Sequence, residues 1–176
     1  MTVPFVVVAA FAIAHFTGSG PAAPGGPLPA LTYSAPPQAD TEAAACAKVL
    51  AQLPVTLRGL DPRVVHTRPD TPFVVAWGDP AVVLRCGVAR PGALKPGSGA
   101  EFILGGNPAG PFYDVQKEGD ANVWTTVDRA AYVSITVPTK YAADPVPTLS
   151  RAIAKALPPV CQVDPTAPNR DLCTRR

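Results

Sequence analysis

The chain has 176 residues, enough for one domain with a substantial hydrophobic core but short for two. Its 15 Lys and Arg residues nearly balance 13 Asp and Glu residues, and the formal charge of +2 gives no indication of a nucleic-acid-binding surface. The 23 prolines exceed the usual proportion, and their positions divide the chain into segments.

The first segment is uncharged and strongly apolar. No Lys, Arg, Asp or Glu occurs before Asp40, and an apolar stretch runs from Val3 to Phe16. Its length is typical of the hydrophobic region of a signal peptide, whereas a membrane-spanning helix needs about 20 residues. No basic residue precedes it, which favours a true start upstream of Met1. Because an upstream apolar extension would make the segment a membrane anchor, residues 1–16 are predicted to be a signal peptide or an anchor of an exported protein.

A linker is predicted over residues 17–39, which are rich in Pro, Gly and Ala. Such a composition buries too little surface to order itself and favours extended backbone. Residues 40–159 are predicted to form a single domain, and residues 160–176 a C-terminal tail.

The domain is predicted to begin with a helix capped by Asp40 and ended by Pro54. Glu42 lies in its first turn, where the helix dipole favours an anion. Its apolar face, at positions i, i+3, i+4 and i+7, consists of Cys46, Val49, Leu50 and Leu53.

Short runs rich in β-branched and aromatic residues follow, separated by turns that contain Pro, Gly or Asp. The central segment of the predicted sheet is residues 77–91, in which a turn leads into a buried strand that ends at Cys86. In the last run Val133, Ile135 and Val137 alternate with polar residues, so one face should be buried. The predicted strands are 55–60, 63–68, 73–76, 81–86, 102–104, 111–116, 122–127 and 132–137.

A second helix is predicted from Pro147 to Leu157, before Pro158 and Pro159. Because no strand-helix-strand repeat occurs, the predicted fold is α+β. In it, an N-terminal and a C-terminal helix pack on one face of a meandering, mainly antiparallel sheet.

The even number of cysteines and the apolar leader favour disulfides and an oxidising compartment. None of the spacings is the close Cys-x-x-Cys pattern of zinc or dithiol sites. Of three possible connectivities, we favour Cys46–Cys86, which ties the first helix to the central strand, and Cys161–Cys173, which closes the tail.

A resemblance to a known family rests on residues 77–91, together with Cys46 and Leu53-Pro54 before them and residues 132–138 after them. Over about residues 40–157 the chain resembles an actinobacterial family of exported or membrane-anchored proteins known only as a domain of unknown function, number three thousand five hundred and fifteen. The resemblance implies an envelope protein with an N-terminal membrane segment, and it brings no ligand or catalytic residue with it.

No catalytic residue, metal site or cofactor is predicted. Ser98 lacks the Gly-x-Ser-x-Gly frame of a hydrolase nucleophile, and a lone His66 without a placed partner is typical of a strand surface. Asp61, His66 and Asp70 are the nearest approach to a metal-ligand cluster, and they are too dispersed to predict one.

Two functions of different classes remain. The first is a noncatalytic module that binds an envelope protein or a cell-wall component, with a membrane attachment through the N-terminal segment. The second is a small hydrolase or transferase acting on wall precursors. Either would use a surface near His66, Trp77, Asp79 and Arg85, where Arg85 could pair with Asp79 or Asp128.

Overall fold

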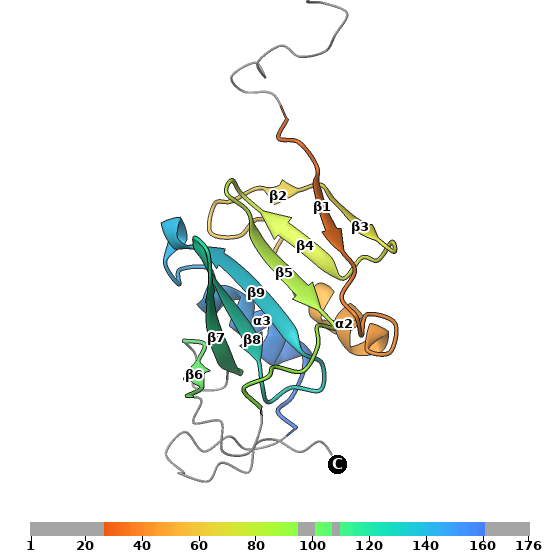
Figure 1. Ribbon diagram of the computed structural model, residues 1–176, viewed down its shortest axis with the longest axis vertical. Coiled ribbons are helices and arrows are strands. Elements are labelled where there is room, and N and C mark those ends of the chain that lie inside the picture. The colour runs from red at the N-terminus through yellow and green to blue at the C-terminus, as the bar shows by residue number, and fades with distance from the viewer. Residues whose placement is uncertain (1–26, 95–100, 107–109, 161–176) are drawn as a thin grey trace, which may run out of the picture.

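The computed structural model describes residues 27–94, 101–106 and 110–160, and Figure 1 shows their arrangement. The predicted leader at residues 1–16 and the predicted Cys161–Cys173 disulfide lie outside these ranges. Among the described residues, no helix combines the length and apolar character needed to cross a bilayer.

In the described part of the chain, seven strands form one sheet in which each neighbouring pair is antiparallel. The order across the sheet is β2-β4-β5-β9-β8-β7-β6, so the last four strands form a meander. The predicted α+β class with a mainly antiparallel sheet is therefore confirmed. The strands are β2 (Pro62–Arg63), β4 (Val74–Trp77), β5 (Val82–Cys86), β6 (Ile103–Leu104), β7 (Phe112–Glu118), β8 (Ala121–Thr126) and β9 (Val133–Pro138).

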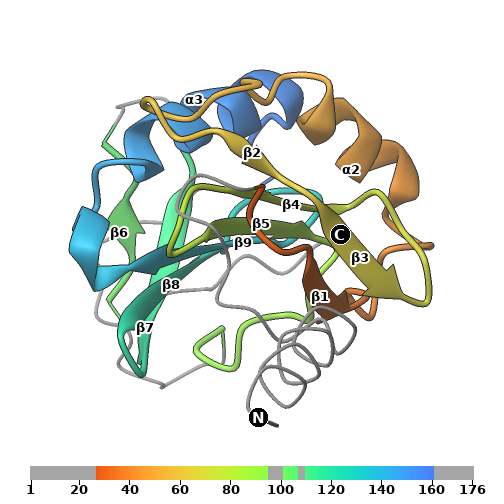
Figure 2. The same cartoon turned by 90° about the horizontal axis from the view of Figure 1, so that it is seen from above.

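The helices α2 (Ala43–Leu50) and α3 (Val146–Ala156) lie next to each other in Figure 2, and a short 3-10 helix, η1 (Thr139–Tyr141), precedes α3. Pro147 lies in the first turn of α3, where its fixed φ suits a helix. By contrast, residues 37–42 form turns, so Glu42 rather than Asp40 precedes α2, and it makes no side-chain cap hydrogen bond.

The main hydrophobic core joins both helices to alternate residues of the sheet. Val133, Ile135 and Val137 of β9 are all buried in this core, as their alternation predicts. The helices contribute Cys46, Val49, Val146, Leu149 and Ile153 to the same cluster, and β5 contributes Val82, Leu84 and Cys86.

The structure contains the predicted disulfide between Cys46 of α2 and Cys86 of β5. Both residues are fully buried, and 40 positions separate them in the sequence. The bond therefore fixes the first helix against the centre of the sheet.

Part of the segment predicted to be a linker forms a strand. Leu31–Ser34 forms β1, which pairs in parallel with β3 (Val65–Arg68) as a separate two-stranded sheet. Leu31 and Tyr33 pack against a small cluster of Val74, Ala76 and Val83. The composition of residues 17–39 predicts a segment that buries too little apolar surface to form regular structure. The packing of Leu31 and Tyr33, two apolar side chains at alternate positions, is nevertheless enough for a short strand.

The prediction of a strand over residues 55–60 is wrong. Arg58 and Gly59 both have positive φ, and the backbone groups of Leu57 and Leu60 bond to each other across the resulting tight turn. The strand predicted over residues 63–68 is divided: β2 pairs with β4, and after Val64 the chain continues as β3 beside β1.

Candidate functional site

The four predicted surface residues lie in different environments. Trp77 on β4 is buried, and its indole Nε1 donates a hydrogen bond to Val55 O at 3.0 Å. His66 is exposed on β3, and Asp79 is exposed in the turn between β4 and β5. Arg85 is half-buried on β5.

Trp77 and Arg85 do not converge on one cleft. Trp77 pairs with Val82 and Arg85 pairs with Val74, so Trp77 and Arg85 lie at opposite ends of the β4–β5 hairpin. Val82 and Arg85 are three positions apart on one strand, and their side chains therefore point to opposite faces of the sheet. The structure brings Trp77 and Asp79 near one end of the hairpin and separates both from Arg85.

The suggested carboxylate partners of Arg85 are also wrong. Arg85 Nη2 donates to Ser34 O in β1 at 3.1 Å. Asp79 instead lies 3.7 Å from Arg63 Nη1, and Asp128 lies 2.9 Å from Arg129 Nη1. Arg85 thus holds β1 against the sheet. The sequence does not indicate this contact, because the composition of residues 17–39 does not predict β1.

A buried polar cluster lies between β7, α3 and the loop after β8. Tyr113 and Ser150 are fully buried, and their hydroxyl oxygens are 2.9 Å apart. Asp128 and Arg129 form a buried ion pair, and Asp128 Oδ1 accepts a hydrogen bond from Phe112 N at 3.1 Å. Sequence reasoning missed this cluster, because an Asp-Arg pair after a strand is usually a solvated turn.

Burial controls the ionisation of this cluster. It raises the pKa of the Tyr113 phenol well above its ordinary value, while the hydrogen bond between Tyr113 and Ser150 acts in the opposite direction. It also raises the pKa of the Asp128 carboxyl, against the effect of the Arg129 guanidinium. The contact between the Tyr113 and Ser150 hydroxyls joins β7 to α3. No three metal-ligating side chains gather anywhere in the described ranges.

A more promising binding feature adjoins Trp77. A hollow of about 300 Å³, which we call the Trp77 hollow, lies between the end of α2, the edge strand β2 and its neighbour β4. Val55 at its rim is 79% exposed. Its lining is almost entirely apolar and consists of Leu50, Leu53, Pro54, Val55, Pro62, Arg63, Val75, Ala76 and Trp77.

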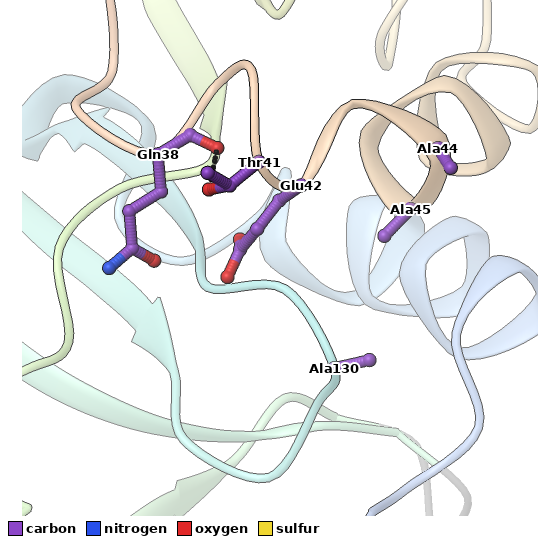
Figure 3. Close-up of a pocket in the computed structure, with 6 residues that line it drawn as sticks. All are labelled: Gln38, Thr41, Glu42, Ala44, Ala45 and Ala130. Carbon is purple, nitrogen blue, oxygen red and sulfur yellow. Dashed lines mark hydrogen bonds between the residues drawn. The ribbon is translucent and has the colours of Figure 1, made fainter.

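A second hollow of about 520 Å³, which we call the α2 hollow, is more polar (Figure 3). Gln38, Thr41 and Glu42 line it together with Ala44, Ala45 and Ala130. Thr41 Oγ1 donates to Gln38 O at 3.1 Å. In Figure 3 the Gln38 and Glu42 side chains extend from their backbone toward the loop that contains Ala130.

The fold and these surfaces define a small α+β domain whose first helix is joined to its sheet by a disulfide. The chain matches the family described as a protein of unknown function, DUF3515, over residues 1–161, and it belongs to that family. No curated protein and no solved structure matched the chain.

Proposed function

We propose that this protein is a noncatalytic binding module of the cell envelope, exported and tethered by its N-terminal segment, that binds another envelope protein through the Trp77 hollow. The observation that carries the proposal is the preformed apolar hollow beside Trp77. Concave, mostly apolar surfaces with a few fixed polar groups are the usual form of binding sites.

The walls of the hollow are held in place. Trp77 is fixed by its hydrogen bond to Val55 O. Arg63 donates to Gly78 O at 2.8 Å and to Pro29 O at 2.7 Å, and its side chain is only 6% exposed. Because these groups are ordered before a partner arrives, binding loses little conformational entropy.

We further infer that α2 and α3 cover the same face of the sheet, the face that carries Val82 and Leu84. Their buried residues share one cluster with these side chains. In this arrangement the Trp77 hollow opens where α2 ends beside the edge of the sheet, and the disulfide sets the position of α2 there.

The lining favours a protein partner over a glycan. Leu50, Leu53 and Val75 offer aliphatic contacts, which suit a buried apolar side chain of a partner. A cell-wall component is the second candidate, and the amide, hydroxyl and carboxylate of the α2 hollow favour it. A hydrolase or transferase site that combines His66, Trp77, Asp79 and Arg85 is less favoured, because Trp77 and Arg85 lie at opposite ends of the β4–β5 hairpin.

The buried Cys46–Cys86 bond supports the export part of the proposal. Disulfides persist in oxidising compartments and are rare where thiols are kept reduced. An exported position would also place the binding surface among envelope components.

The test is site-specific photocrosslinking in intact envelopes, with benzoylphenylalanine in place of Val55. The matched control carries it at Ile103, which is exposed on β6 at the other edge of the sheet. We expect a discrete protein adduct from position 55 alone, and its loss when Leu53→Glu places a charge in the hollow of a folded protein.

Three other results would count against the assignment. Identical adducts from both positions would show nonspecific contact, and no adduct from position 55 would show that the hollow has no protein partner. An adduct that a muramidase removes would assign the partner to the cell wall.

A further inference from the structure

Exposed apolar side chains gather where the described chain begins. Leu28 is 47% exposed and Val64 is 61% exposed, although large aliphatic side chains are normally buried. Pro27, Pro29 and Pro62 are exposed around them. We call these five residues the N-terminal apolar patch.

The patch joins residues that are distant in sequence. Leu31 N donates to Val64 O at 2.9 Å, and Arg63 Nη2 donates to Pro29 O at 2.7 Å. Pairing of β1 with β3 holds the same region. In Figure 1 this corner, at the start of β1 and beside β2, lies far from β6. These bonds therefore hold the backbone segments that carry Leu28 and Val64 beside each other.

The chain that precedes the patch indicates what covers it. Twenty-six residues precede Pro27, and they include the apolar stretch from Val3 to Phe16. The ten residues 17–26 can span at most about 35 Å when fully extended. With Val3–Phe16 in a bilayer, the N-terminal apolar patch is thus the part of the described domain with the shortest connection to the lipid surface.

We propose that the N-terminal apolar patch docks on the surface of a lipid bilayer, an inference that rests on the tether in the proposed function. Tethering makes docking intramolecular, so a small patch suffices where free association would be weak. The same contact would hold the Trp77 hollow close to the membrane, because Arg63 and Pro62 belong to both the hollow and this corner. The partner of the hollow is then a membrane protein or the membrane-proximal part of one.

Charge has a minor role in this docking. Arg63 lies 3.7 Å from Asp79, and Asp61 is exposed next to Pro62. Lys140 Nζ donates to Asp79 O at 3.2 Å, so Arg63 and Lys140 are balanced by Asp79 and Asp61, and no surplus of positive charge is present among these residues to select anionic lipids. Docking through aliphatic side chains should persist at high salt, whereas electrostatic binding would be screened.

The experiment uses the full chain reconstituted with vesicles of phosphatidylethanolamine and phosphatidylglycerol, with or without brominated acyl chains. Val64→Trp reports on the patch, and Ile103→Trp is the matched control at the opposite edge of the sheet. The emission of the native Trp77 and Trp124 is subtracted by using the parent protein. Flotation of the vesicles measures the tether separately.

We expect all variants to float, and the indole of Val64→Trp to shift to the blue and lose emission with brominated lipid, at low and high salt alike. Adding Leu28→Asp should restore that emission without changing flotation. Two results would overturn docking and leave the tether intact. The protein could float with equal quenching of Val64→Trp and Ile103→Trp, or it could float with no quenching of Val64→Trp. Quenching that disappears at high salt would overturn the aliphatic basis. Failure to float would overturn tether and docking together.

Discussion

Removal of the Cys46–Cys86 bond should cost the domain a large share of its stability. The bond closes a loop over a sequence separation of 40, and the chain-entropy relation gives about 4 kcal/mol for a loop of this length. Typical domains are stable by only ~5–15 kcal/mol, so this loss is large. In a domain of this size it corresponds to a decrease in melting temperature of roughly 8–16 °C.

The assay compares urea unfolding of Cys46→Ala/Cys86→Ala with its parent. Both proteins carry Cys161→Ser and Cys173→Ser, so that no other thiol can form a bond. Replacing both partners avoids leaving one buried thiol without its bonded sulfur. A difference in the free energy of unfolding below about 1 kcal/mol would refute the reasoning, because the chain-entropy relation allows no value that small.

Three further predictions concern the buried cluster and the residues around the start of β1. The pKa of Tyr113 is raised above its ordinary value of 10.0, so the unfolded state loses its proton first. Stability that is present below pH 10 should therefore decrease above it, by up to about 1.4 kcal/mol per pH unit more than in Tyr113→Phe, measured by urea unfolding. A Cβ on Gly105 would overlap Ser150 Oγ and lie 2.5 Å from Tyr113 Cε2, so Gly105→Ala should cost about 1–3 kcal/mol. Gly92→Ala, where nothing lies within 4 Å, should change stability by less than about 0.5 kcal/mol, and equal effects would contradict the packing argument. Arg63→Met removes the donor to Pro29 O and should accelerate hydrogen exchange of Leu31 N–H by about tenfold or more. Unchanged exchange would show that Arg63 does not hold this segment.

The hydrophobic pattern of the sequence predicts those elements whose periodicity agrees with the face that is buried in the folded protein. In β9 the alternation of Val133, Ile135 and Val137 coincides with one buried face. In α3 the apolar spacing and the prolines at both ends agree with the observed helix. The cysteine on the buried face of α2 and the cysteine at the end of β5 could be paired because each lies in the core.

The remaining features depend on contacts distant in sequence. β1 exists because β3 pairs with it and Val83 lies beneath it, and neither fact appears in the composition of residues 17–39. The turn at Arg58 was missed because a non-glycine residue with positive φ leaves no signal in a propensity pattern.

The candidate site was predicted only in part. Trp77 does line a hollow, but Leu50, Leu53 and Val75 reach the same hollow from other elements, and only the fold brings them together. Arg85 belongs to the same motif as Trp77, but the pairing of β4 with β5 places the two residues at opposite ends of the hairpin. His66 lies on β3, a strand of the separate two-stranded sheet.

Disulfide mapping of the protein from intact cells, alkylated before lysis and digested without reduction, tests most directly whether this is an exported domain held by the Cys46–Cys86 bond. We expect a peptide pair joined through Cys46 and Cys86, with neither cysteine alkylated. Quantitative alkylation of both cysteines would contradict export, because a domain in an oxidising compartment could not keep these two thiols free.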